Sequence, residues 1–247
     1  MIDDQLEATL APFIAKGAMI AVVGGDGTIS AVANLVVGTK AVLAPLPGGT
    51  LNHFTKDLGI SQELDEAIKS LAYSKVHTID VAEVNKHIFI NNSSIGLYPS
   101  SLRERDKIET TLGKWPAAVF ASVRALVRLR TFTVTIGKET FRTPFVFVGN
   151  NKYALDGLGA PVRTRLNQGV LSVFMAKTVS RLALLKITLF ALVGKAHLLT
   201  DLEVRTVSSL TIKMKRSRTH VSYDGEVRKL PSPLSYSVRK KALRVRY

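Results

Sequence analysis

The sequence contains no cysteine among its 247 residues. Disulfide bonds and cysteine-ligated metal sites are therefore excluded, and the composition fits a reducing compartment. Long apolar runs are missing as well: the most apolar stretch, residues 182–193, carries Lys186 and is shorter than the roughly 20 residues that cross a bilayer. Residues 1–4 hold two aspartates and lack the positive charge that begins a secretory signal. We therefore expect a cytoplasmic protein without a membrane-spanning helix.

Acidic residues are scarce in most of the chain. Residues 1–66 carry three Lys or Arg and eight Asp or Glu, whereas residues 67–247 carry 31 and 11. A strongly basic part favours an anionic membrane surface or a nucleic acid, unless the surface is simply basic and has no specific partner. Because no nucleic-acid-binding motif accompanies the charge, we expect no nucleic acid partner and peripheral contact with the inner face of the membrane. The residues expected near lipid headgroups, or otherwise on a solvated face, are Arg124, Arg128, Arg163 and Arg165.

The first part of the chain alternates helical patterns with apolar strands. Helical spacing of apolar residues covers residues 2–16, 29–36, 52–58 and 62–73, and the apolar runs at 19–23 and 41–44 are typical of buried parallel strands. Residues 1–75 are therefore predicted to form a small Rossmann-like α/β lobe. Each strand leads into a glycine-rich turn, and parallel neighbouring strands would bring the two turns to one edge of the sheet.

The first glycine turn reads Gly24-Gly25-Asp26-Gly27-Thr28. A strand, a glycine turn and a helix start place backbone N–H groups where a phosphate binds, and glycine lets the backbone approach the phosphate closely. The carboxylate of Asp26 would repel a bare phosphate, so we interpret it as a partner for a metal ion, a hydroxyl or a ribose. The alternative is that Asp26 caps the helix that follows.

From residue 76 the pattern changes to an alternation of apolar and polar residues, which indicates strands. Strands are expected at residues 76–83, 88–90, 132–136, 143–148 and 170–175, and several antiparallel strands are expected within 203–246. Residues 91–99 are expected to form a turn, and helices are expected at 117–130 and 182–192. We therefore predict a larger antiparallel β-sandwich lobe at residues 76–247, whose last strand can return to the first lobe, with the active site in the cleft between them.

Further motifs follow in order at residues 80–85, 89–98, 147–153 and 223–226, and the last of these reads Tyr223-Asp224-Gly225-Glu226. Together with Gly-Gly-Asp-Gly-Thr and the Pro-Gly-Gly-Thr-Leu-Asn-His-Phe of residues 47–54, they resemble the bacterial lipid kinase branch of the diacylglycerol kinase catalytic domain family, which is related to sphingosine kinases. The resemblance is specific, because NAD kinases lack the Asn-Asn-Ser-Ser-Ile-Gly of residues 91–96 and the late Asp-Gly-Glu.

The resemblance implies a kinase that transfers the γ-phosphoryl group of ATP, with Mg²⁺, to the hydroxyl of a diacylglycerol-like lipid. The residues implied to bind the nucleotide are Gly24, Gly25, Asp26, Gly27, Thr28 and Thr50. Asp26 would also be the essential aspartate of the loop, and Glu226 the proton acceptor. Phosphoryl transfer does need a carboxylate within reach of the attacking hydroxyl. Taken alone, residues 224–226 are more typical of a β-turn with two solvated acids, and Thr50 is equally typical of a helix N-cap.

The sequence departs from the family pattern at three places. Members of the family begin with a strand, a helix and a second strand of the nucleotide lobe, and these have no counterpart in this sequence. We therefore expect an incomplete lobe, whose open sheet edge would favour a homodimer. His53 stands where many members have a catalytic aspartate, and it cannot supply a permanent negative charge. Gln168 stands where members with a structural Mg²⁺ have an aspartate, so that metal is not expected. Two alternatives stay open: a nucleotide- or lipid-binding homologue without catalysis, and an enzyme similar to NAD kinases.

Overall fold

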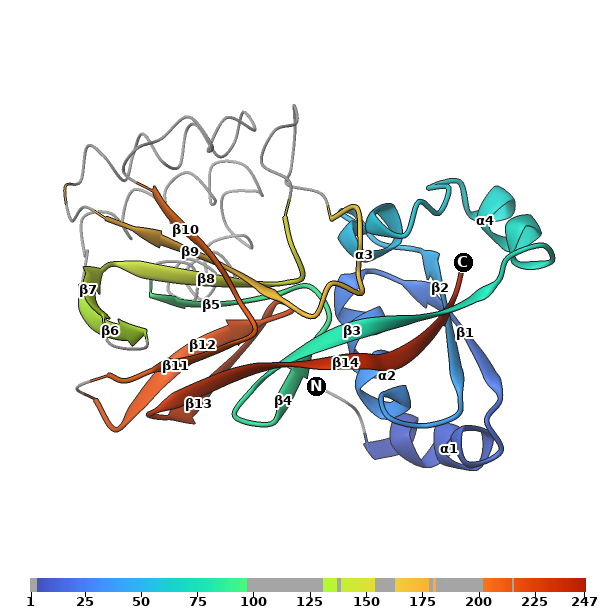
Figure 1. Ribbon diagram of the computed structural model, residues 1–247. Helices are drawn as coiled ribbons and strands as arrows, with labels where there is room; N and C mark the ends of the chain where they lie inside the picture. The colour runs from blue at the N-terminus through green and yellow to red at the C-terminus, as the bar shows by residue number, and fades with distance from the viewer. Residues whose placement is uncertain are drawn as a thin grey trace, which may run out of the picture.

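The computed structural model describes residues 4–96, 131–136, 139–153, 163–177, 180, 202–214 and 216–247. The helices expected at 117–130 and 182–192, together with Arg124 and Arg128, lie outside this part of the chain. Within it, a small α/β lobe is followed by a larger lobe of antiparallel strands, and two long strands run through both lobes (Figure 1). The predicted fold class is confirmed.

The α/β lobe is built around one side of a six-stranded sheet, in which the first two strands are parallel neighbours. In spatial order the strands are β1 (Met19–Gly24), β2 (Val42–Pro47), β14 (Leu234–Arg246), β3 (Val76–Val84) and β4 (His87–Phe89), and β11 (Ser209–Ile212) pairs with β14. The helices are α1 (Asp4–Ala15), α2 (Asp26–Val36), α3 (His53–Asp57) and α4 (Leu64–Leu71). Helix α2 packs on both β1 and β2, whereas α3 and α4 pack on β2. The buried core of this lobe includes Ile29, Leu43, Phe54 and Val245.

The last strand connects the two lobes. Strand β14 has 13 residues, pairs in parallel with β2 through Val245 and Leu43, and pairs antiparallel with β3 on its other side. A register shift between Arg239 and Leu243 marks a bulge. The bulge contains Lys241, whose φ is 49°. The first half of β14 pairs with β11, so a single strand belongs to the α/β sheet at one end and to the β-rich lobe at the other (Figure 1).

A second six-stranded sheet, entirely antiparallel, forms the body of the β-rich lobe. Its strands in spatial order are β10 (Leu202–Val207), β9 (Leu171–Ala176), β8 (Phe145–Asn150), β5 (Asn92–Gly96), β12 (Arg218–Tyr223) and β13 (Glu226–Pro231), and a separate hairpin joins β6 (Phe132–Ile136) to β7 (Glu139–Thr143). The expectation of a turn at residues 91–99 is wrong for the described residues, because β5 is a central strand. Its polar residues hide the usual alternation: Ser93 is buried, and its Oγ lies 3.1 Å from the hydroxyl of Tyr236.

Two helix faces differ from the prediction. The helical spacing of residues 2–16 predicts that Leu6, Leu10, Phe13 and Ile14 share one buried face. In the structure Leu6, Leu10 and Ile14 pack against the core, but the side chain of Phe13 is 54% exposed. In α4 only Ala67 is buried, whereas Ile68 is 48% exposed. Both helices lie at the margin of the lobe, where a neighbour covers a narrower face than the apolar pattern indicates. None of the described helices has the length and apolarity needed to cross a bilayer.

Candidate active site

The two glycine turns meet at the carboxyl ends of β1 and β2, as predicted. The N–H of Gly48 donates to the carbonyl of Gly24 at 3.1 Å. A Cβ added to Gly48 would lie 2.8 Å from the nitrogen of Gly24, and one added to Gly49 would lie 2.5 Å from the Cα of Gly25. Any side chain at these positions would push the turns apart, so glycine allows two loops of backbone N–H groups to stand side by side, which suits a phosphate.

Asp26 uses its carboxylate to hold the neighbouring helix. Its two oxygens accept the backbone N–H groups of His53 and Phe54, at 3.1 and 2.9 Å, where α3 begins. The expectation that Asp26 caps its own helix is wrong, since Gly25 is the N-cap of α2. The N-cap expected at Thr50 is wrong too, because Asn52 occupies that position of α3, with φ of 52°. Asp26 therefore fixes the second glycine turn relative to the first.

Asp224 is the organising group of the β12–β13 hairpin. Asp224 and Gly225 form the two-residue turn, with φ of 44° and 88°. The carboxylate of Asp224 accepts four hydrogen bonds, from the hydroxyl of Ser30 at 2.6 Å and from the N–H groups of Ile90, Asn91 and Asn92 at 2.7, 2.9 and 3.1 Å. Desolvation raises the pKa of Asp224, and these hydrogen bonds oppose the rise. The turn was expected. The hydrogen bond that Asp224 accepts from Ser30 also connects the hairpin to α2.

Glu226 follows that turn and faces a small hollow. The hollow has a volume of about 150 Å³ and also contains Gly27 of the glycine turn, Lys86, His87 and Arg228. The carboxylate of Glu226 lies 3.3 Å from the guanidinium of Arg228. The start of α2, at Gly27, and the candidate proton acceptor, Glu226, thus line the same hollow. Asp26 lies next to Gly27 in the chain, and its Oδ1 is 3.5 Å from the side-chain nitrogen of Asn91, whose backbone N–H binds Asp224.

A buried arginine, which the sequence analysis placed near lipid headgroups, connects these parts. The side chain of Arg163 is 0% exposed and lies 2.6 Å from the carboxylate of Asp57 in α3. It also donates to the carbonyl of Ile90 and to the side-chain oxygen of Asn91, each at 2.6 Å. The headgroup expectation is therefore wrong for Arg163. No local pattern indicates this network, because these partners lie 72 to 106 residues away from Arg163 along the chain.

Two of the three departures from the family pattern, His53 and Gln168, take part in structural hydrogen bonds. The side chain of His53 is exposed, and its backbone N–H binds Asp26. The side-chain oxygen of Gln168 accepts the N–H of Lys152 at 3.2 Å. Among the described residues, no group of three or more histidines and acids gathers to hold a metal ion.

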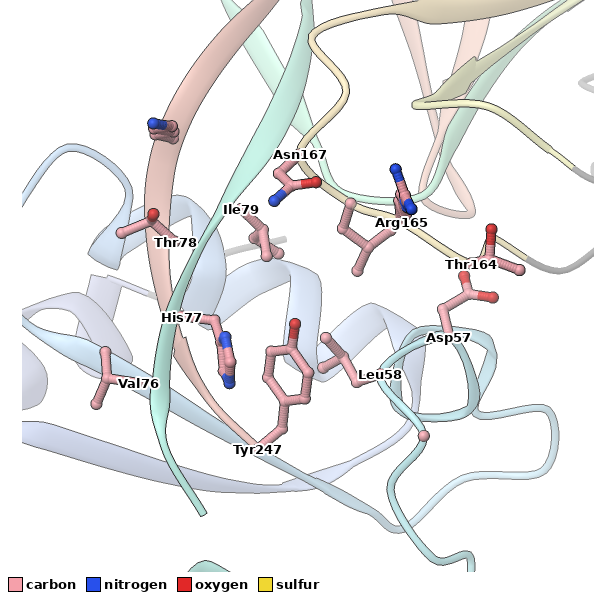
Figure 2. Close-up of a pocket in the computed structure, with 13 residues that line it drawn as sticks. Asp57, Leu58, Val76, His77, Thr78, Ile79, Thr164, Arg165, Asn167 and Tyr247 are labelled. Atoms are coloured by element: carbon pink, nitrogen blue, oxygen red, sulfur yellow. The ribbon is translucent and has the colours of Figure 1, made fainter.

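A larger hollow, of about 640 Å³, lies beside the C-terminal end of α3. Leu58, Ile79 and Leu166 are its buried apolar residues, and the rings of His77 and Tyr247 lie 4.6 Å apart beside them. Figure 2 shows the hydroxyl of Tyr247 pointing between Ile79 and Leu58. This hollow contains Arg165 but none of the residues predicted to bind the nucleotide or to take part in catalysis. The smaller hollow, which holds both Gly27 and Glu226, is therefore the candidate active site.

Comparison with known proteins identifies the family. Residues 4–84 match the family model described as diacylglycerol kinase catalytic domain, and residues 104–247 match the one described as YegS C-terminal NAD kinase beta sandwich-like domain. The second model covers more than half of the chain, so the chain belongs to the family that this model describes, and its first third matches the diacylglycerol kinase catalytic domain. Both matches agree with the resemblance of the sequence motifs, and relatives of the chain carry the name lipid kinase.

Individual relatives agree with this assignment. The "Probable lipid kinase YegS-like" of Klebsiella pneumoniae is 32% identical over 181 residues, which are 69% of this chain and 57% of that protein. The "Probable lipid kinase YegS" of Salmonella gallinarum is 32% identical over 60% of this chain and 52% of its own length. The chain thus spans little more than half of these relatives. A crystal structure of a diacylglycerol kinase from Bacillus anthracis is similar in fold, with a TM-score of 0.68 at 22% identity over 97% of this chain and 79% of that one.

Proposed function

We propose that this protein is an ATP-dependent lipid kinase that transfers the γ-phosphoryl group of ATP to a hydroxyl of a diacylglycerol-like lipid. One observation carries the proposal: Gly27 of the phosphate-type turn and Glu226 line the same hollow. An anion cradle beside a carboxylate is the arrangement that phosphoryl transfer to a hydroxyl requires.

Each part of the site has one task in this reaction. The backbone N–H groups of the two glycine turns hold the nucleotide phosphates, with Thr28 and Thr50 at their exposed rims. Glu226 takes the proton of the lipid hydroxyl while the hydroxyl oxygen forms its bond to the γ-phosphorus. The bond between that phosphorus and the bridging oxygen of ADP breaks, and ADP leaves. Asp26 keeps the two turns in register by holding the start of α3.

Mg²⁺ fits this arrangement through Asp26. Magnesium in kinases is usually held by one or two carboxylates together with phosphate oxygens and water, so a cluster of three acids is not required. Asp26 is the carboxylate of the glycine turn, and its Oδ2 accepts one hydrogen bond, from the N–H of His53, so that oxygen has a second lone pair for the ion. When bound, the ion would neutralise charge on the phosphates.

The remaining partners follow from the charge of the chain. We propose that the basic second part meets an anionic membrane surface at its cytoplasmic face, where a lipid acceptor would be found. Lys and Arg outnumber Asp and Glu by 31 to 11 in residues 67–247, and each basic residue at such a surface contributes about 1 kcal/mol.

Radiolabelled transfer from ATP tests the function. The protein is incubated with [γ-³²P]ATP, Mg²⁺ and, in separate mixed micelles or solutions, diacylglycerol, a sphingoid base, phosphatidylglycerol or NAD. We expect label in the product of diacylglycerol. Label in NAD alone would overturn the lipid kinase proposal, and nucleotide or lipid binding without any transfer would indicate a homologue without catalysis.

An Asp26→Asn variant tests the loop. The amide keeps one acceptor oxygen and turns an N–H₂ toward one of the two backbone N–H groups that Asp26 binds, so the second turn should lose its register. We expect kcat/KM for lipid phosphorylation to fall by roughly 10-fold, the value of one lost charge-assisted hydrogen bond. The matched control is Asp65→Asn, in the first turn of α4 and exposed. Unchanged lipid phosphorylation in Asp26→Asn would remove this residue from the mechanism.

A further inference from the structure

The hairpin between β3 and β4 places a lysine where a glycine is usual. Val84 pairs with His87, so Asn85 and Lys86 form a two-residue turn, and their φ angles are 46° and 70°. Such a turn needs positive φ at both positions and favours Asn followed by Gly. Asn85 follows this preference, but Lys86 does not. A residue with a Cβ adopts the left-handed region at an energetic cost, so the presence of lysine at this position indicates a role for its side chain.

The surroundings hold this turn firmly. The side-chain nitrogen of Asn85 donates to the carbonyls of Pro231 and Pro233 at 2.9 and 3.2 Å, and its side-chain oxygen accepts the N–H of Ser235 at 2.8 Å. The N–H of Asn85 donates in return to the carbonyl of Ser235 at 3.0 Å. Four hydrogen bonds therefore fix Asn85, and with it the unusual backbone of Lys86. Conformations of this kind persist where neighbours over-determine them, and they concentrate at functional sites.

Lys86 lines the hollow of the candidate active site and is its unpaired charge. Asp224 is satisfied by four donors, and Glu226 pairs with Arg228. Burial, and then the charge of Arg228, lower the pKa of His87 from 6.5, so that this imidazole is neutral near pH 7. Lys86 makes no ion pair with any residue that the structure describes. Its ammonium is left for a ligand that carries negative charge.

The glycine turns themselves offer no cationic side chain. Residues 24–28 and 47–52 contain neither Lys nor Arg, although a transferred phosphoryl group needs its charge neutralised. We propose that Lys86 and Arg228 form a phosphate subsite beside Glu226, which binds the phosphate monoester formed on the acceptor lipid. This subsite rests on the proposed function, because it assigns the acceptor side of that reaction to the hollow.

The proton transfer would switch this subsite on. Before the reaction, Arg228 is paired with the carboxylate of Glu226 at 3.3 Å. The acceptor hydroxyl loses its proton to Glu226 as its oxygen bonds to the γ-phosphorus, and the bond from that phosphorus to ADP breaks. Neutral Glu226 no longer holds Arg228, so the guanidinium becomes available when the new phosphate appears. Lys86 is available throughout, and it would orient the phosphate before and after transfer.

A glycine substitution tests Lys86 without harming the turn. Lys86→Gly removes the ammonium and supplies the residue that the turn prefers, so we expect Tm to stay equal or to rise. Calorimetric titration with sn-glycerol 3-phosphate, a soluble phosphate monoester, should show roughly 10-fold weaker binding than wild type, as expected for one lost charge-assisted contact. Affinity for ADP should stay within about threefold, because the glycine turns hold the nucleotide. Lys86→Arg should retain the binding of sn-glycerol 3-phosphate.

Lys241→Gly is the matched control, since Lys241 is also exposed and also has positive φ, 49°, but lies away from this hollow. It should bind both ligands as wild type does. Unchanged binding of sn-glycerol 3-phosphate in Lys86→Gly, an equal loss in Lys241→Gly, or a loss confined to ADP would each overturn the subsite. Neither titration requires turnover. If Lys86→Gly shows the expected loss of sn-glycerol 3-phosphate binding but the wild-type protein transfers no phosphate, only the proposed function is refuted. If the wild-type protein is active but Lys86→Gly binds sn-glycerol 3-phosphate normally, only the subsite is refuted.

Discussion

Replacing Arg163 with methionine is expected to lower the free energy of unfolding by about 3–5 kcal/mol, the usual cost of removing one partner of a buried ion pair. The guanidinium is fully buried and holds α3 through Asp57, the end of β4 through the carbonyl of Ile90, and the side chain of Asn91. Methionine fills much of the same space but makes none of these bonds. The carboxylate of Asp57, itself only 7% exposed, would keep the backbone N–H of residue 163 but lose its charged partner.

Urea denaturation, followed by far-UV circular dichroism, measures this loss as a lower midpoint at an unchanged slope. Arg165→Met is the control two residues away: its side chain is exposed and makes no ion pair with the described residues, so its stability should stay within about 0.5 kcal/mol of wild type. The double variant Asp57→Asn/Arg163→Met should lose less than the sum of the single changes, because both remove one interaction. Equal losses in Arg163→Met and Arg165→Met would contradict the network.

Glu226→Gln is expected to lower kcat for lipid phosphorylation by about 10²–10⁴-fold, the range that a positioned general base contributes. Glutamine has nearly the same shape and still accepts a hydrogen bond from Arg228, but it cannot take the proton of the acceptor hydroxyl. KM for ATP should change little, since the nucleotide is held by the glycine turns. The effect should therefore appear in kcat, as expected for an interaction made only in the transition state.

Steady-state kinetics with saturating lipid in mixed micelles measure kcat and KM for ATP separately. Glu7→Gln, on the exposed surface of α1, is the control for the chemical change and should leave both constants unchanged. Retained binding of ADP shows that the variant is folded. A kcat within threefold of wild type for Glu226→Gln would assign the proton to another group or to solvent.

The parts of the fold that could be predicted are those set by local pattern. Apolar runs followed by glycine identified β1, β2 and their turns, and the parallel pairing of the strands brought Gly24 and Gly48 together. Alternation identified most strands of the β-rich lobe. Strand β5 could not be found this way, because its buried Ser93 and Ser94 give no apolar signal.

The polar network of the site could not be predicted, because pairing between distant residues overrides single-residue preference. Arginine is almost never fully buried unless it is paired, and the sequence does not reveal that Asp57 pairs with Arg163 across 106 positions. The local pattern of residues 224–226, taken alone, is typical of a turn with solvated acids, and it does not reveal the bonds of Asp224, because their donors come from α2 and from the start of β5. The resemblance singled out Glu226, but only the folded chain brings it to the hollow that contains Gly27.

Strand β14 has a consequence for how this molecule is divided. It lies between β2 and β3, in the middle of the α/β sheet, although it comes last in the chain. Without residues 234–246 the α/β sheet would be split into two halves, one of β1 and β2 and the other of β3 and β4. Residues 4–84 therefore lack the central strand of their own sheet, which residues 234–246 supply from the other end of the described chain.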